Sequence, residues 1–290
     1  MIFPKFEYLA PQSLEEAISL VSQLGPGCRV MAGGTDLLVL MKEKAIKPEY
    51  IVDLKGIDGL DALEYIPEKG LKIGALTTLR SIEKSETVKK YYPAVADSAH
   101  YVASTQVRSK GTMAGNICNA SPSCDTAPIL IVLEATVHTE GPAGPSKIDA
   151  EKLFKGPKKT ILEQGEIVTE ITIPEMKPGQ GAAYVKHAYR KAMDLAIVGV
   201  AASITLENDR CKDAKIALGA VAATPIRALK AEEMLIGKEM TDDVIEAAAI
   251  AAMENCCPIS DVRASAEYRQ DMVRVFTKRA IKKAMESINA

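Results

Sequence analysis

Two separate glycine clusters constrain the fold of this chain more than any other feature of its sequence. The first, "AGGTD", spans Ala32 to Asp36, and the second, "GTMAGN", spans Gly111 to Asn116. Adjacent glycines cost backbone entropy and are kept where a chain turns sharply or where a ligand approaches the backbone. Either cluster alone is most simply a structural turn. Together, two loops with small side chains and threonine hydroxyls predict a site that binds one pyrophosphate from both sides.

The first cluster lies between a predicted strand and a predicted helix. Ser13 and Glu16 form a capping box in front of "LEEAISLVSQL", and residues 25–27, Gly-Pro-Gly, end that helix. "CRVMA" then predicts a short buried strand, and "DLLVLMKE" predicts a helix. Gly33 and Gly34 therefore fall on a strand-to-helix turn, where the backbone amides of a helix N-terminus favour an anion.

The rest of the chain changes character twice. From Lys55 it reads as strands and turns with helices near Leu79 and after Pro93, and after Met176 it reads as further strands. From Arg227 the chain is mostly helical, and its alanine-rich amphipathic pattern favours packing or a subunit interface over catalysis. We therefore expect three units, of residues 1–55, 56–176 and 177–290.

Composition removes several classes of function. The 290 residues carry a net charge of −2 with acids and bases interspersed, which argues against a nucleic-acid partner. No apolar run is long enough for a membrane span, and the N-terminus lacks a signal-peptide core, so we expect a cytoplasmic protein. The six cysteines form no Cys-x-x-Cys pair and are expected to be reduced thiols, with no metal site and no catalytic residue identified.

Five ordered segments give the chain a specific resemblance. "AGGTDLL" resembles a first pyrophosphate loop, and "QVRSKGTMAGNICNASPSCDTAP" resembles a second one that carries a Ser-Pro and an aspartate. Three further segments complete the pattern: "YVKHAYRKAMDLAIVGVA", "LGAVAATPIRA" and "VRASAEYRQDMVRVFTKRA". In this order the whole chain resembles the FAD-binding medium subunit of the molybdenum hydroxylases, the family of xanthine dehydrogenase and aerobic carbon monoxide dehydrogenase.

The resemblance implies an α+β protein. Its first two units would form a vanillyl-alcohol-oxidase/PCMH-like FAD-binding fold, and its third a small antiparallel sheet with helices, like the C-terminal domain of the carbon monoxide dehydrogenase flavoprotein. The implied function is that of an oxidoreductase subunit. It would take electrons from a small partner subunit with two [2Fe–2S] clusters to non-covalent FAD, and pass them to NAD+ or another acceptor. The molybdenum cofactor would reside in a large partner subunit.

The resemblance also implies cofactor-binding residues. The first loop would hold the pyrophosphate and part of the flavin, and the second would close over it; Asp125 would bind the ribityl or ribose region, Val168 would pack near adenine or flavin, and Lys186 would lie near the isoalloxazine ring. The residues of the two loops are Val30, Met31, Ala32, Gly33, Gly34, Thr35, Asp36 and Leu37, then Thr112, Met113, Ala114, Gly115 and Asn116. Ala114 stands where the family usually has glycine, and it would be strained if that position needs φ > 0.

Alternatives follow from the same residues. Asp125 could instead cap a helix beginning near Thr126, and Lys186 could be a solvated strand residue. The resemblance favours a xanthine-type or related heterocycle hydroxylase, with carbon monoxide dehydrogenase as the alternative. The loop with four cysteines for a [4Fe–4S] cluster, found in some family members, is absent after Asp125. A stand-alone flavin oxidoreductase and a flavin-free scaffold remain the other two hypotheses.

Overall fold

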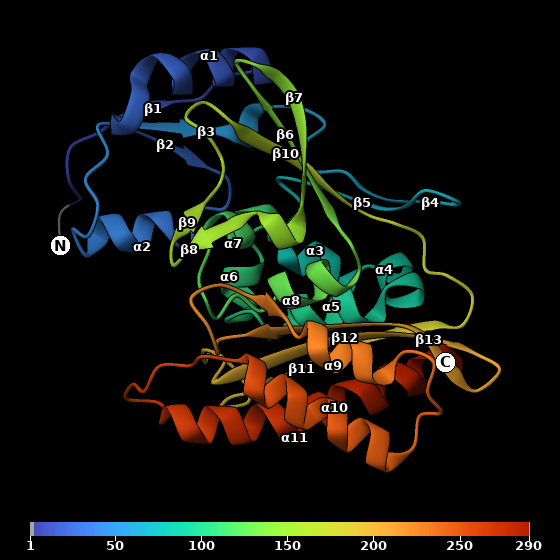
Figure 1. Cartoon of the computed structure of the whole chain (residues 1–290). Coiled ribbons are helices and arrows are strands. Elements are labelled where there is room, and N and C mark those ends of the chain that lie inside the picture. The colour runs from blue at the N-terminus through green and yellow to red at the C-terminus, as the bar shows by residue number, and fades with distance from the viewer. Residues whose placement is uncertain (1–2, 290) are drawn as a thin grey trace.

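The computed structural model describes residues 3–289, and its three main sheets follow one another along the chain (Figure 1). Each sheet is accompanied by helices from its own part of the sequence, so the predicted α+β class is confirmed. Among the described residues no helix is both long and apolar enough to cross a membrane.

The first sheet is parallel and carries the first glycine cluster. Its strands lie in the order β1-β3-β2, and α1 and α2 make the two crossovers. The hydroxyl of Ser13 accepts a hydrogen bond from the amide of Glu16, while the Glu16 carboxylate accepts from Gln12 rather than Ser13. The elements are β1 (Glu7–Leu9), α1 (Leu14–Leu24), β2 (Cys28–Met31), α2 (Leu37–Lys42) and β3 (Tyr50–Asp53), with 3₁₀ turns at Gly25–Gly27 and Leu54–Gly56.

The second sheet is antiparallel, with strand order β4-β5-β10-β6-β7. Its strands are β4 (Leu63–Ile66), β5 (Gly70–Gly74), β6 (Thr136–Gly141), β7 (Gly144–Asp149) and β10 (Ile167–Ile173), and β8 (Phe154–Gly156) and β9 (Lys159–Thr160) form a separate hairpin after a 3₁₀ turn at Ala150–Lys152. Only residues 142 and 143 separate β6 from β7.

Six short helices lie between β5 and β6. They are α3 (Leu79–Lys84), α4 (Glu86–Tyr91), α5 (Pro93–Tyr101), α6 (Thr105–Arg108), α7 (Met113–Cys118) and α8 (Ala127–Val132). The helices predicted near Leu79 and after Pro93 are both present, with Thr78 as the cap of α3 and Pro93 as the first residue of α5. The helices α4, α6 and α7 were not predicted, because four to six residues are too few to show a helical period.

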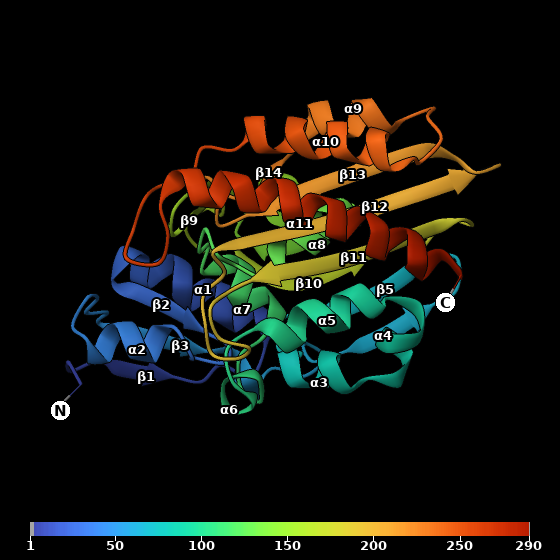
Figure 2. The same ribbon diagram turned by 90° about the horizontal axis from the view of Figure 1, so that it is seen from below.

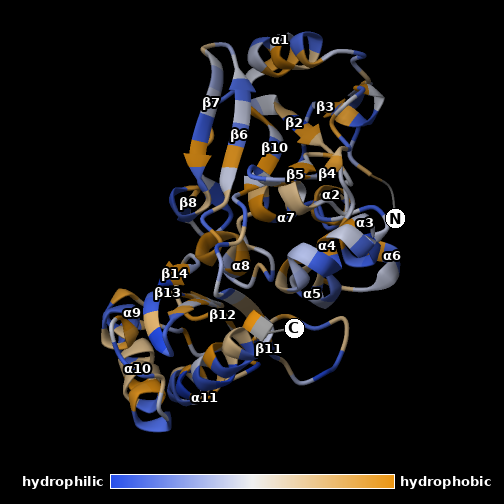
Figure 3. Cartoon of the chain, turned by 90° about the vertical axis from the view of Figure 1, so that its right-hand side faces the viewer, coloured by the Kyte–Doolittle hydropathy of each residue, from blue (hydrophilic) through white to orange (hydrophobic). Residues whose placement is uncertain are grey.

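The third sheet is antiparallel, with strand order β11-β12-β13-β14, and it is covered on both faces. Figure 2 shows α9–α11 on one face, and α5 and α8 pack on the other. The first eight residues of β12 are therefore all buried. The elements are β11 (Gln180–His187), β12 (Val198–Glu207), β13 (Arg210–Gly219), β14 (Ile226–Arg227), α9 (Leu229–Leu235), α10 (Asp242–Asn255), α11 (Ala266–Glu286) and a 3₁₀ turn at Ser287–Asn289. Hydrophobic and hydrophilic residues alternate around α10 and α11 (Figure 3).

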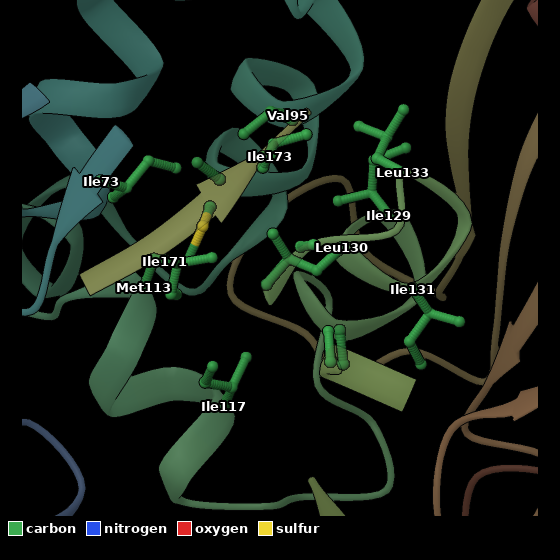
Figure 4. Close-up of a cluster of buried hydrophobic side chains, with 14 of the residues drawn as sticks. Ile73, Val95, Met113, Ile117, Ile129, Leu130, Ile131, Leu133, Ile171 and Ile173 are labelled. Atoms are coloured by element: carbon green, nitrogen blue, oxygen red, sulfur yellow. The ribbon is translucent and has the colours of Figure 1, made fainter. Parts of the chain in front are cut away.

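The core of the middle region anchors the second glycine cluster. Met113 and Ile117 project from α7 into a group of buried side chains that includes Leu130 of α8 and Ile171 of β10 (Figure 4). Met113 is fully buried, and Ile117 nearly so. The loop that opens α7 is therefore held by one apolar face of its own helix.

Candidate functional site

The first glycine cluster forms a turn with unused backbone donors. Val30 and Met31 end β2, residues 32–36 make the turn, and Leu37 begins α2. Gly34 has φ +72°, a conformation that favours glycine. The backbone amides of residues 33–36 donate to no acceptor in the described part of the chain. All four residues are at least partly exposed to solvent.

The two glycine clusters touch each other through their backbones. A Cβ atom placed on Gly33 would lie 2.0 Å from the carbonyl oxygen of Lys110 and 2.8 Å from the Cα atom of Gly111. No side chain fits at that distance, so the contact requires glycine. A hydrogen bond between side chains also joins the two segments, because Asn119 Nδ2 donates to Asp36 Oδ1 at 2.8 Å.

The second cluster opens α7. The hydroxyl of Thr112 caps the helix by accepting from the amide of Gly115 at 2.9 Å. The amides of Met113 and Ala114 have no acceptor among the described residues, as expected for the first turn of a helix. Ala114 is buried and does not have positive φ, so alanine adds no left-handed strain at this position.

The side chain of Asn116 links the second cluster to the segment around Asp125. Asn116 Oδ1 accepts from the hydroxyl of Thr126 at 2.7 Å and from the thiol of Cys124 at 3.0 Å. Burial raises the pKa of Cys118 to about 12 and that of Cys124 to about 11. Both therefore remain neutral thiols at neutral pH, which disfavours a reactive thiolate here.

Asp125 and Lys186 form a buried ion pair. Lys186 Nζ lies 2.8 Å from Asp125 Oδ2, with side chains 5% and 9% exposed, and it also donates to the carbonyl of Tyr101 at 3.2 Å. The hydroxyl of Tyr184 donates to Asp125 Oδ1 at 2.8 Å. Burial raises the pKa of Asp125, and the contacts with Lys186 and Tyr184 lower it in part.

This pairing excludes both simpler interpretations of the two residues. Helix α8 begins after Thr126 without a side-chain cap, so the alternative that Asp125 caps this helix is wrong. Lys186 is buried, so the alternative that it is a solvated strand residue is also wrong.

Val168 lies apart from these contacts. It is buried on β10, next to a register shift between Val168 and Glu170. Sequence reasoning did not identify Lys110, Asn119 or Tyr184 as parts of this arrangement. Lys110 and Asn119 both lie within the quoted loop segment, but their partners are distant in sequence and no local pattern reports the pairing.

Two surface depressions lie elsewhere. One of about 560 Å³ is lined by residues of α9 and α10, and another by residues of α10 and α11. Neither includes a residue of the glycine clusters. Within residues 3–289 there is no group of three histidine, cysteine, aspartate or glutamate side chains placed to hold a metal ion.

The residues of the two clusters fit a dinucleotide pyrophosphate. Free amides at residues 33–36 and at the start of α7 supply donors, and the absence of a side chain at Gly33 lets the two clusters come into backbone contact. Amide donors in a turn and at a helix start suit an anionic group.

Two family models together match nearly the whole chain. Residues 4–176 match the FAD binding domain in molybdopterin dehydrogenase, and residues 183–284 match the CO dehydrogenase flavoprotein C-terminal domain.

Individual proteins show the same likeness. The medium chain of carbon monoxide dehydrogenase from Hydrogenophaga pseudoflava is 36% identical over 98% of both chains. The xanthine dehydrogenase FAD-binding subunit of Escherichia coli O157:H7 is 30% identical over 98% of this chain and 97% of its own. A chain in a solved structure of the H. pseudoflava enzyme superposes with a TM-score of 0.95, with 99% of each chain covered. The first two sheets and their helices thus have the predicted vanillyl-alcohol-oxidase/PCMH-like FAD-binding fold, followed by the predicted C-terminal domain.

Proposed function

This chain belongs to the family of FAD-binding medium subunits of the molybdenum hydroxylases, and we propose that it carries electrons through FAD held between its two glycine clusters. The observation that carries the proposal is the contact of Gly33 with Lys110, which brings two sets of free amides to one place. FAD supplies the redox chemistry when bound, and the chain supplies its binding and electrostatic surroundings.

The residues then have separate tasks. The amides of residues 33–36 and of Met113 and Ala114 would donate to the pyrophosphate oxygens. Lys186 has three N–H donors, of which two are used by Asp125 and Tyr101, so one remains for a ligand. We propose that this donor faces the flavin, that Asp125 orients it and binds the ribityl or ribose region, and that Val168 packs against adenine or flavin.

The proposed setting is a complex of three kinds of subunit. A large subunit would hold the molybdenum cofactor, and a small subunit would pass electrons from two [2Fe–2S] clusters to FAD, from which NAD+ or another acceptor would take them. Relatives named as medium chains and as a FAD-binding subunit support this. Six free cysteines suit the reducing cytoplasm that we propose as its location.

We further propose three units within the chain, of residues 1–55, 56–176 and 177–290, of which residues 1, 2 and 290 lie outside the described part. The first and second main sheets fall in the first and second units, and the third sheet falls in the last. The matched family models end at residue 176 and resume at residue 183, which supports the second boundary.

For the substrate we propose a xanthine-type or related heterocycle. Carbon monoxide is the second candidate. It is supported by the identity of 36% to the H. pseudoflava chain, against 30% to the xanthine dehydrogenase subunit. In either case the substrate would react at the partner's molybdenum, so no residue of this chain would act as its acid or base.

Two measurements test the proposal. The purified full chain should show a flavin absorption spectrum, and acid precipitation should release that flavin into the supernatant. Colour that stays in the pellet would contradict non-covalent binding, and the absence of flavin would support the scaffold. Pull-down from native cells should recover molybdenum and iron with the chain, whereas flavin without either metal would support a stand-alone enzyme.

A further inference from the structure

A buried ion pair lies directly before the second glycine cluster. Arg108 Nε donates to Glu83 Oε2 at 2.9 Å and Nη2 donates to Glu83 Oε1 at 3.4 Å, with side chains 7% and 8% exposed. His100 and Arg80 also contact this carboxylate, at 3.0 and 3.1 Å. Burial opposes ionisation of Glu83, but the bonds from His100, Arg108 and Arg80 outweigh it and hold its pKa at about 2.

The remaining donors of Arg108 fix the turn between α5 and α6. Nη1 donates to the carbonyls of Val102 and Ala103 at 3.0 and 3.4 Å, and Nη2 donates to the hydroxyl of Thr105 at 3.3 Å. Ala103 has φ +45°, which is unfavourable for alanine and persists only where the surroundings hold it. Arg108 therefore joins α3, the end of α5 and α6 through one side chain.

The same helix, α3, also contacts the second glycine cluster directly. The amide of Leu79, the first residue of α3, donates to the carbonyl of Gly111 at 2.9 Å, and Thr78 pairs with Thr112. Lys110, whose carbonyl lies against Gly33, is thus bracketed by two attachments to α3: Arg108 before it and Gly111 after it. Figure 2 shows α6 beside α3 in this arrangement.

We propose that Glu83 and Arg108 are positioning residues for FAD. They fix the position of the Lys110–Thr112 backbone relative to Gly33. The inference rests on the proposed binding of FAD at the two clusters. A buried ion pair is in itself weak evidence for stability, because desolvation offsets the attraction. The five N–H groups of Arg108 all bond to neighbouring elements, which points instead to a fixed geometry. Besides the turn between α5 and α6, this geometry sets the position of the loop at Lys110, which belongs to the proposed site.

A double-mutant cycle on FAD affinity tests this role. The full chain is freed of FAD, and FAD is titrated into Gly33→Ala, Arg108→Gln and the double variant. We expect Arg108→Gln to weaken FAD binding about tenfold or more, a change of about 1.4 kcal/mol. Without Arg108, the backbone at Lys110 can move away from the new methyl group at position 33. The factor by which Gly33→Ala weakens FAD binding should therefore be at least about fivefold smaller in the Arg108→Gln background than in the wild type.

Arg227 provides the matched control. It pairs with Glu232 in the C-terminal region, where the side chains are 18% and 6% exposed, far from either glycine cluster in sequence. Arg227→Gln should lower thermal stability yet leave the FAD dissociation constant within about twofold, and its effect should add to that of Gly33→Ala. This separates loss of positioning from general destabilisation.

Unchanged FAD affinity in folded Arg108→Gln, or strict additivity with Gly33→Ala, would overturn the inference and leave the pair a purely structural contact. If Gly33→Ala alone also leaves the affinity unchanged, the placement of FAD at the clusters fails as well, so the two failures are distinguishable. Should Arg108→Gln not fold, Arg108→Lys and Glu83→Gln give the same test, because each keeps the side chain near its size while removing the bidentate ion pair.

Discussion

The ammonium group of Lys186 and the carboxylate of Asp125 meet at 2.8 Å between two parts of the chain that are 61 residues apart. Lys186 belongs to β11 of the third sheet, and Asp125 to the segment between α7 and α8. Both side chains are less than a tenth exposed. The pair therefore fastens the C-terminal sheet to the segment that Asn116 also contacts, next to the second glycine cluster.

Removing either partner should destabilise the protein strongly. Lys186→Met leaves a buried carboxylate without its cation, and we expect a loss of about 3–5 kcal/mol in the free energy of unfolding by urea. Lys186→Met combined with Asp125→Asn should lose less than the two single losses added. Lys212 is the control, because its pair with Glu207 is 58% and 60% exposed, and Lys212→Met should change stability by less than about 1 kcal/mol. Equal losses at both lysines would refute the buried pair.

Ala114→Gly should affect stability and not FAD affinity. Ala114 is a buried helical residue without positive φ, so glycine relieves no strain there. The change removes a buried methyl group and adds backbone entropy to the unfolded chain, at a combined cost of about 1–2 kcal/mol. Thermal unfolding of the flavin-free protein measures this, with Ala247→Gly in α10 as a helical control. Tighter FAD binding by tenfold would show instead that the alanine obstructs the ligand.

Stability should fall in acid through Glu83. Its folded pKa of about 2 lies below the ordinary 4.5, so its contribution is present above pH 4.5 and is lost as the pH falls through about 2. The difference corresponds to at most about 3 kcal/mol. The free energy of unfolding by urea should therefore be higher for the wild type than for Glu83→Gln at pH 6, and this difference should narrow below pH 4.5. Glu86→Gln should show a much smaller difference, because solvent screens the pair of Glu86 with Lys89, whose Glu86 side chain is 87% exposed. A difference for Glu83→Gln that is independent of pH would exclude this linkage.

Local signals in the sequence predicted the local structure well. The strand-turn-helix around Gly33, the Ser13 cap and the helix near Leu79 are each specified within a few neighbouring residues, and all are present. The short helix α7 was missed because its packing on the core, and not its own periodicity, stabilises it. The helix α6 was missed because its one buried residue, Arg108, is held by distant partners.

Contacts between distant segments could not be predicted in this way. Nothing near Gly33 indicates that its hydrogen faces the carbonyl of Lys110, and nothing near Asp125 indicates Tyr184. The resemblance to a family brought the two clusters together in expectation, but it assigned Asp125 and Lys186 to the ligand separately. Only the fold shows that they bind each other, so that one N–H of Lys186 has no partner among residues 3–289.

The dissociation constant of FAD for Gly33→Val tests the proposed site most directly. Valine cannot enter the space beside Lys110, so the clusters should separate and donor amides should lose the pyrophosphate. Each lost bond to a charged oxygen is worth about 1.5–3 kcal/mol, so we predict binding weakened about tenfold to a hundredfold per bond. Gly27→Ala is the control, because a Cβ there meets Glu49 at an ordinary 3.6 Å, and its affinity should match the wild type. An unchanged dissociation constant in folded Gly33→Val would remove the first cluster from the FAD site and leave it a structural turn.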